Sequence, residues 1–251
     1  MEDVIGKGTG GTIRRASDLE GNAWAVKIMG DVDDAVMEYS YGKILHHPCL
    51  CASKHMYVED GKAYIVMELM EKDLYAIVAR SGPLSEKDAR TVVDRVARGL
   101  EYMHDRGSVH RDVKPSNIML ARDGRFDTVK LGDFGLSEDG VTRKIRGTPG
   151  FMAPEIGDDS GPRRLGPAVD AYALGVTLRF LLTGDKTGDK TGDKKPGKPT
   201  TSKHAADLIR RLVATDPGER PTMSDVLDHP FCSQSAGNPC SHAIQRAFGC
   251  M

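Results

Sequence analysis

The chain has 251 residues, of which 39% are hydrophobic and 28% charged, and its 35 basic and 36 acidic residues leave a net charge of -1. This composition fits one large soluble domain or two small lobes, and it excludes fibrous, collagen-like and mini-protein classes. The balanced charge argues against a protein that mainly neutralises nucleic acid or an anionic membrane. We expect neither as a partner.

Two further features suggest where the chain works. Residues 1–11 lack the apolar stretch of a secretion signal, and the most apolar segment, Ala168–Leu182, is too short to span a membrane and carries Asp170 and Arg179. The odd number of scattered cysteines favours reduced thiols over disulfides or zinc: Cys49, Cys51, Cys232, Cys240 and Cys250. We expect a cytoplasmic protein, and a nuclear one stays possible.

The elements expected along the chain change from strands to helices. Apolar or alternating runs predict strands at Val4–Ile13, Ala23–Met29, Met56–Val58 and Ala63–Glu68, with one helix over Val32–His46. From Leu84 a helical period begins, with Ser85 and Asp88 as a capping box and Gly107 as the stop. Short strands at Ile118–Leu120 and Val129–Leu131 and helices at Ala168–Leu182, Ala205–Val213 and Met223–Asp228 follow.

The segment 184–203 differs in kind, because Gly-Asp-Lys-Thr occurs at 184–187 and again at 188–191, and a third copy begins at 192. It has almost no apolar residues and a period too short for a solenoid, so we expect an exposed, mobile loop. A basic targeting signal is a weaker alternative. The tail 233–251 is thinly apolar, and we expect it to be only partly ordered.

A glycine-rich motif at the amino end gives the first indication of chemistry. Gly6, Gly8 and Gly11 form Gly-x-Gly-x-x-Gly, whose backbone N–H groups can approach phosphate oxygens closely. A flexible turn explains this motif alone equally well. A dinucleotide fold needs a helix directly afterwards, whereas a hairpin ending in Lys27 is expected here. A lysine opposite the loop can reach phosphate if a fixed acid holds it, and Glu38 is the candidate.

Three motifs in the second half carry more weight together than singly. They are Val109-His110-Arg111-Asp112-Val113-Lys114-Pro115-Ser116-Asn117, Asp133-Phe134-Gly135 and Ala153-Pro154-Glu155. Each alone has an ordinary explanation as a loop, a turn or a helix start. In this order and spacing, the chain resembles the eukaryotic protein kinases over residues 4–232.

The resemblance implies an α+β, bilobal protein kinase fold. The implied divisions are a β-rich N-lobe at 1–66, a hinge at 67–73 and a mainly helical C-lobe at 74–232, which contains the insert 184–203; the tail is 233–251. The resemblance also implies ATP and Mg²⁺ as cofactors and protein substrates as partners. It leaves the oligomeric state open.

The resemblance assigns roles to individual residues. Asp112 would orient the substrate hydroxyl and accept its proton, and Lys114 would neutralise the γ-phosphate. Asn117 and Asp133 would hold Mg²⁺, and Lys27, positioned by Glu38, would grip the α- and β-phosphates. The implied ATP-binding set is Ile5, Gly6, Lys7, Gly8, Thr9, Gly10, Gly11, Ile13, Ala25, Lys27, Met67, Glu68, Met70, Asp73 and Met119.

Other matches are architectural or regulatory. Arg111, Asp170 and the pair Glu155 and Arg220 resemble residues that hold the catalytic and activation segments together. Arg111 before the catalytic aspartate also resembles kinases activated by phosphorylation of that segment. The usual acceptor position is Lys144, so Thr142 and Ser137 are the candidates, out of register.

The substrate class follows to one level. Lys114 and the segment Gly147–Phe151 resemble serine/threonine kinases, with features of both the calmodulin-dependent and the mitogen-activated groups. Ser116 replaces a glutamate frequent in kinases that prefer basic peptides.

Three departures from the family pattern keep a second function open. Gly10 replaces the usual aromatic residue at the loop tip, which should make the loop more mobile. The separation between Lys27 and Glu38 is short enough to displace Glu38. The repeat loop stands where the family has a docking helix. The alternative is therefore a catalytically impaired kinase-fold scaffold that binds nucleotide and partners. A small-molecule phosphotransferase is a more distant third.

Overall fold

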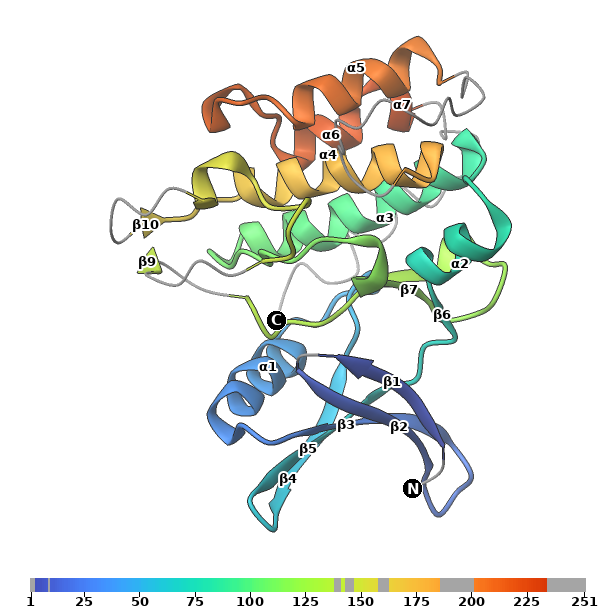
Figure 1. Ribbon diagram of the computed structural model, residues 1–251, viewed down its shortest axis with the longest axis vertical. Helices are drawn as coiled ribbons and strands as arrows, with labels where there is room; N and C mark the ends of the chain where they lie inside the picture. Colours follow the sequence, from blue (N-terminus) through green and yellow to red (C-terminus); the bar gives the residue numbers. More distant parts are fainter. Residues whose placement is uncertain are drawn as a thin grey trace, which may run out of the picture.

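The chain folds into two parts, a small sheet-rich one and a larger helical one (Figure 1). The computed structural model describes residues 3–8, 10–137, 141–142, 147–157, 163–185 and 201–233. The fold is the bilobal α+β arrangement expected from the sequence.

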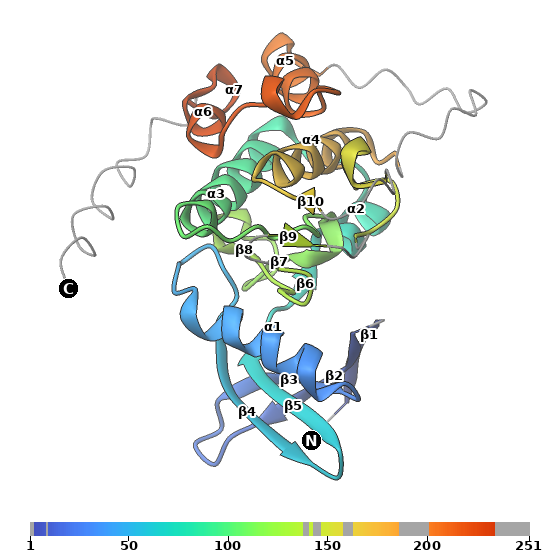
Figure 2. The same ribbon diagram turned by 90° about the vertical axis from the view of Figure 1, so that its left-hand side faces the viewer.

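The small lobe is built on a five-stranded antiparallel sheet in the order β1-β2-β3-β5-β4. The strands are β1 (Val4–Gly8), β2 (Gly11–Ser17), β3 (Ala23–Met29), β4 (Ser53–Glu59) and β5 (Lys62–Glu68), and helix α1 (Val32–Ile44) lies across one face (Figures 1 and 2). Buried residues of helix and sheet, among them Met29, Ala35, Ala63 and Ile65, form the core of this lobe. Their burial supplies the main stabilising term that holds α1 on the sheet.

The large lobe is mainly helical. Its helices are α2 (Leu74–Ser81), α3 (Glu86–His104), α4 (Ala168–Thr183), α5 (Lys203–Leu212), α6 (Met223–Asp228) and α7 (Pro230–Ser233). The central pair, α3 and α4, contributes more buried side chains to the main core than any other two elements. Short 3-10 turns lie at Pro115–Asn117, Phe126–Thr128, Pro154–Gly157 and Pro217–Glu219.

Two small sheets position the functional segments of the large lobe. Strands β6 (Lys72–Asp73), β7 (Ile118–Leu120) and β8 (Val129–Leu131) form one, and β9 (Val141–Thr142) pairs with β10 (Arg163–Arg164) in the other. The first sheet lies where the chain passes between the lobes (Figure 1). An isolated bridge between Leu50 and Leu131 adds a second link from the small-lobe segment to the large lobe.

The sequence predictions for β3, β7, β8 and α6 are confirmed to the residue. The strand predicted over Val4–Ile13 was wrong, because the chain turns after β1 and starts β2 at Gly11. Helix α2 was not predicted, although the Asp73 side chain caps it by accepting from Ala76 N at 2.8 Å. The predicted loop 184–203 gives way to α5 at Lys203, and residues 186–200 of it lie outside the described residues.

Three of the five cysteines lie in the described part of the chain. Cys49, Cys51 and Cys232 are free and buried, and burial raises the pKa of the Cys51 thiol to about 12. Cys240 and Cys250 lie outside the described residues. Within the described ranges, no helix combines the length and the apolar run that crossing a bilayer requires.

Candidate active site

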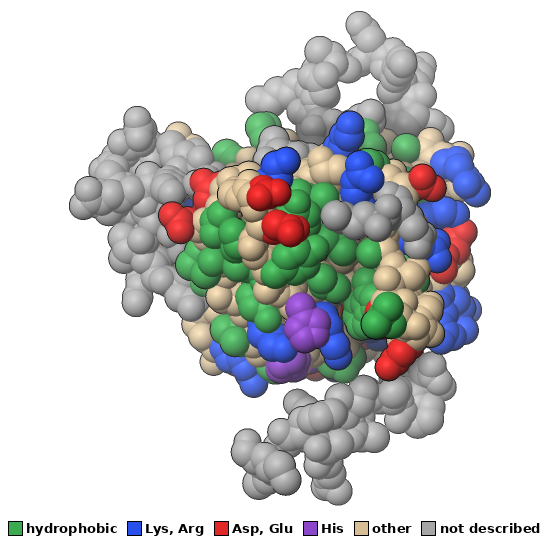
Figure 3. All heavy atoms as spheres, turned by 90° about the horizontal axis from the view of Figure 1, so that it is seen from below, with side chains coloured by type: hydrophobic (Ala, Val, Ile, Leu, Met, Phe, Trp, Pro, Cys, Tyr) green, Lys and Arg blue, Asp and Glu red, His purple; other side chains and the backbone are tan. Residues whose placement is uncertain are grey.

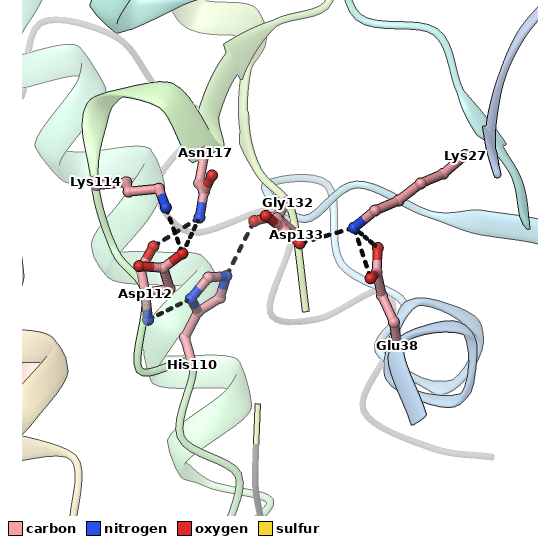
Figure 4. Close-up of polar contacts among 8 residues, drawn as sticks. All are labelled: Lys27, Glu38, His110, Asp112, Lys114, Asn117, Gly132 and Asp133. Atoms are coloured by element: carbon pink, nitrogen blue, oxygen red, sulfur yellow. Dashed lines mark hydrogen bonds and ion pairs between the residues drawn. The ribbon is translucent and has the colours of Figure 1, made fainter. Parts of the chain in front are cut away.

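The predicted catalytic loop comes together around the Asp112 carboxylate (Figure 4). Lys114 Nζ donates to Asp112 Oδ2 at 2.6 Å, and Asn117 Nδ2 donates to the same oxygen at 3.0 Å and to the Asp112 carbonyl at 2.9 Å. The loop can make these contacts because the 3-10 turn Pro115–Asn117 folds Asn117 back on Asp112. Charged hydrogen bonds of this length fix the carboxylate in one orientation.

Threonine 148 completes this cluster from a distant part of the chain. Its Oγ1 donates to Asp112 Oδ1 at 2.7 Å and accepts from Lys114 Nζ at 2.7 Å. From the sequence, Thr148 was only part of a segment that marks the substrate class, and it was not predicted as a site residue. The Gly147-Thr148-Pro149 segment was the available signal, but no local pattern reveals a contact that spans 36 residues.

The buried Asp170 supports the catalytic loop from below. Its carboxylate, 0% exposed, accepts from the backbone N–H groups of His110 at 2.9 Å and Arg111 at 2.8 Å, and it contacts His104 Nε2 at 2.9 Å. Burial pushes the pKa of Asp170 upward, but the bonds from His104 and the loop outweigh it and hold the pKa below its ordinary value. Asp170 therefore joins helix α4 to the backbone of the catalytic loop and to His104.

The second half of the site lies in the small lobe. Lys27 Nζ on β3 donates to both carboxylate oxygens of Glu38 on α1, at 2.7 and 2.6 Å, and to Asp133 Oδ1 at 3.1 Å (Figure 4). Burial lowers the pKa of Lys27, but Asp133 and Glu38 together raise it above its ordinary value. Lys27 is thus a fixed cation next to Asp133.

The short Lys27–Glu38 separation does not displace Glu38, so that expectation was wrong. Only Gly30 and Asp31 lie between β3 and α1. Asp31 caps the helix by accepting from Asp34 N at 3.0 Å, so α1 starts at once and carries Glu38 to the lysine. The connection between β3 and α1 is short, and the ion pair between Lys27 and Glu38 still forms.

Asp133 and Asn117 have the chemistry that Mg²⁺ needs. Burial raises the pKa of Asp133, but the Lys27 cation outweighs this and holds the pKa below its ordinary value. Asp133 has a φ of 64°, a strained conformation of the kind found at functional sites. Figure 4 shows Asp133 between Lys27 and the catalytic loop. Within the described part of the chain, Asp133 Oδ2 and Asn117 Oδ1 accept no hydrogen bond, so both stay available as hard oxygen ligands.

These two ligands would bind a metal only together with other oxygens. Among the described residues, no group of three or more His, Cys, Asp or Glu side chains is arranged to hold a metal ion by itself. Two protein oxygens plus phosphate oxygens is the usual way proteins bind Mg²⁺ at phosphate-transfer sites. The residues therefore fit a metal that arrives with a nucleotide.

The glycine loop lies over Lys27. A Cβ atom at Gly10 would lie 3.0 Å from Lys27 Nζ and 3.2 Å from Cε. Gly11 has a φ of 132°, and a Cβ there would meet the Ile28 carbonyl oxygen, so only glycine fits. Ile5, Gly6, Lys7 and Gly8 lie in β1, and Thr9 lies outside the described residues. The predicted loop is thus next to the predicted phosphate-binding lysine.

The predicted adenine residues gather where the lobes join. Ala25 pairs with Met67 across β3 and β5, Ile13 pairs with Lys27, and Asp73 pairs with Met119 across β6 and β7. Met70 lies between β5 and β6. Glu68 N donates to Ala52 O at 3.2 Å, so this N–H group is engaged within the protein.

Lys130 is a further contact that the sequence did not reveal. Its Nζ donates to both carboxylate oxygens of Glu68 at 2.7 Å, linking the end of β5 to β8. This pair fixes the hinge against the strand that leads into Asp133. The two residues are 62 positions apart, so no spacing rule indicates them.

The remaining candidates are the architectural residues and the possible phosphorylation sites. Arg220 forms a bidentate pair with Glu155 at 2.6 and 2.8 Å and also donates to Ala168 O, as expected for an architectural pair. Arg111 is buried, with a φ of 69°. Ser137 is 7% exposed, and its buried Oγ has no hydrogen-bond partner among the described residues, so a kinase could reach it only after the segment moves. Thr142 lies in β9, opposite Arg163.

The small lobe carries a buried Lys27–Glu38 pair that contacts Asp133, and the large lobe carries the Asp112 loop. This arrangement on two lobes is that of the protein kinase class. The chain matches the protein kinase domain family over residues 1–232 and belongs to it. It is a eukaryotic-type protein kinase domain of the serine/threonine class.

Similar proteins include several named kinases. The chain is 29% identical to calcium/calmodulin-dependent protein kinase type 1 of Macrobrachium nipponense over 95% of this chain and 76% of that protein. It is 32% identical to sperm motility kinase 2B of Mus musculus over 88% of this chain and 47% of that protein. NUAK family SNF1-like kinase 2 of Rattus norvegicus is also 32% identical, over 90% of this chain and 39% of that protein. The chain thus spans about half the length, or less, of the last two.

Proposed function

We propose that this domain uses ATP and Mg²⁺ to phosphorylate protein serine and threonine residues, with Asp112 as the group that orients the substrate hydroxyl. The observation that carries the proposal is the Asp112 carboxylate, whose two oxygens are held by Lys114, Asn117 and Thr148. Such a cluster has little use in a passive scaffold. It fits a base that must be aimed before a proton is transferred.

The chain's own residues supply positioning and charge. The substrate hydroxyl oxygen forms the new bond to the γ-phosphorus, the bond to the ADP oxygen breaks, and the hydroxyl proton passes to Asp112. Lys114 and Lys27 offset negative charge on the phosphoryl oxygens. Asp133 and Asn117 would hold Mg²⁺, which when bound neutralises the developing phosphate charge.

The backbone and the lobe junction would bind the nucleotide. The backbone of Gly6, Gly8, Gly10 and Gly11 would approach the phosphates closely, and Ala25, Met67 and Met119 would offer apolar contact to adenine. One Asp73 oxygen caps α2, which leaves the other for the ribose hydroxyls. These roles follow from matching positions in the family pattern.

The partners and the location of the protein are proposed from its relatives and its composition. Protein substrates fit the kinase relatives. The balanced charge supports our proposal that neither nucleic acid nor a membrane is a partner. The free thiols of Cys49, Cys51 and Cys232 support our proposal of a cytoplasmic location. The calmodulin dependence in the name of one relative is a property of that protein.

One assay tests the proposal against the scaffold alternative. The full chain is incubated with γ-labelled ATP, Mg²⁺ and a generic protein substrate, and Asp112→Asn is the matched control. We expect labelled phosphoserine and phosphothreonine from the wild type, loss on chelation of Mg²⁺, and a rate at least roughly 10²-fold lower for Asp112→Asn. Metal-dependent ATP binding with no transfer above the control would contradict the proposal and favour the scaffold.

A further inference from the structure

Helix α1 exposes apolar side chains on the face that points away from the small-lobe sheet. Val36, Met37 and Ile44 are 42%, 52% and 64% exposed. The opposite face buries Ala35, Glu38, Tyr41 and Gly42. A helix that lies on a sheet with its other face in water normally shows polar residues there. Apolar residues on both faces indicate that something covers the outer one.

Strand β4, which packs against α1, exposes another apolar side chain. Val58 is 51% exposed on β4, which is an edge strand of the sheet. It pairs with Ala63, a residue of the core under α1, so Val58 shares the face on which α1 lies. We call Val36, Met37, Ile44 and Val58 the α1 patch. Figure 3, a view of the small-lobe end, shows hydrophobic side chains gathered between acidic and basic groups.

Charges at the two ends of α1 limit what can cover the patch. Asp33 lies in the first turn and Lys43 in the last, and both are exposed on the same side of the helix as Val36, Met37 and Ile44. An antiparallel helix with acid at its first turn and base at its last would meet opposite charges at both ends. Helix α1 is such a helix, so the α1 patch is complementary to itself.

We propose that the α1 patch binds a second copy of this chain in a two-fold symmetric dimer. Antiparallel α1 helices then pair Asp33 of each copy with Lys43 of the other and bury the apolar side chains between them. A surface that complements itself in this way closes as a dimer and does not extend into a filament. Hydrophobic burial supplies affinity, and the two charge pairs set the orientation.

The dimer would also affect the active site. Glu38 lies on the buried face of the same helix and holds Lys27. Covering the outer face of α1 stabilises the helix in the position that forms this pair. The activity per chain should therefore rise with protein concentration. This consequence rests on the proposed function, whereas the dimer itself does not.

Charge reversal gives the sharpest test. Sedimentation velocity of the full chain over a range of concentrations is compared for wild type, Asp33→Lys, Lys43→Asp and an equimolar mixture of the two variants. We expect a wild-type monomer–dimer equilibrium and a dissociation constant at least roughly tenfold higher for each variant alone. The mixture should regain dimers, because one variant then presents two lysines to the two aspartates of the other.

Two more variants separate the patch from general surface effects. Met37→Glu should abolish the dimer, and Leu19→Glu, at an exposed turn residue outside the patch, should leave it unchanged. A wild type that stays monomeric at all concentrations, or a mixture that sediments like the separate variants, overturns the proposal. A monomeric wild type that loses a different protein partner through Met37→Glu overturns it as well and assigns the patch to that partner.

Discussion

The two halves of the active site are held in different ways. Asp112 and Asn117 lie on a loop whose backbone donates to the fully buried Asp170 and whose side chains bond to one another. Lys27 and Glu38 meet through one ion pair, and Glu38 belongs to a helix with an exposed outer face. The first half is part of the large-lobe core, and the second depends on the position of α1.

This difference indicates where activity can be regulated. Segments with many buried, satisfied contacts open only with the whole domain, and segments with fewer contacts open locally. We expect the catalytic loop to be in place whenever the large lobe is folded. The ion pair between Lys27 and Glu38 should be the part of the site that forms or breaks when a second chain or a nucleotide binds.

The largest effect should come from the support of the large-lobe half. Replacing Asp170→Asn removes the buried charge that holds His110, Arg111 and His104. We expect the free energy of unfolding to fall by roughly 3–5 kcal/mol, which denaturant titration measures. Asp60→Asn, in an exposed turn, is the control and should stay within about 0.5 kcal/mol of wild type. A loss below about 1 kcal/mol would show that the loop is not anchored as described.

Breaking the small-lobe half should affect catalysis more than stability. In Glu38→Gln, Lys27 keeps its contact with Asp133 but loses its fixed partner on α1. We expect kcat/KM to fall roughly 10²-fold, while the unfolding midpoint changes less than for Asp170→Asn. Glu59→Gln on β4 serves as the matched control. Equal loss of stability in Glu38→Gln and Asp170→Asn would remove the contrast between the two halves.

The short connection between β3 and α1 gives a smaller effect. Inserting Gly-Ser-Gly-Ser between Gly30 and Asp31 lengthens a two-residue connection and costs roughly 1 kcal/mol of loop entropy. If the connection helps to hold α1, kcat should fall about fivefold. The same insertion between Asp60 and Gly61, in the β4–β5 turn, should leave kcat unchanged. Unchanged kcat in both proteins would mean that packing alone positions the helix.

The smallest effect is a pH dependence at the junction of the lobes. His47 stacks on Tyr102 of α3, and burial together with Arg95, Arg98 and Arg106 lowers its pKa from 6.5 to about 4. Between these values the unfolded chain binds a proton that the folded chain does not, so stability falls as the pH drops from about 6.5 toward 4.

The measurement is the difference in unfolding free energy between pH 7 and pH 5. Part of that difference should disappear in His47→Gln, while His204→Gln, on exposed α5, should retain it. An identical pH dependence in wild type and His47→Gln would contradict the role of His47.

The sequence could indicate which large-lobe residues lie together because these residues are close together in the chain. Asp112, Lys114 and Asn117 lie within one segment, and the short strands around them have clear apolar patterns. The architectural pair of Glu155 and Arg220 was also anticipated, since both residues stand in specific motifs.

The parts that the sequence did not predict depend on packing between distant segments. Thr148 reaches Asp112 across 36 positions and Lys130 reaches Glu68 across 62, and neither residue type is distinctive. The number of residues between Lys27 and Glu38 suggested a displaced helix, because spacing alone does not show that Asp31 starts α1 immediately. Helix α2 was not predicted because its eight residues are too few for a strong periodic pattern of apolar residues.

Native-state hydrogen exchange of the full chain tests the contrast between the two halves most directly. The N–H groups of His110 and Arg111, which donate to Asp170, should exchange only with global unfolding. The N–H groups of α1 should exchange faster at low protein concentration and slow down when ATP and Mg²⁺ are added. Equal protection from exchange in α1 and the catalytic loop without nucleotide would contradict this account, in which the Lys27–Glu38 pair is less firmly held than the catalytic loop.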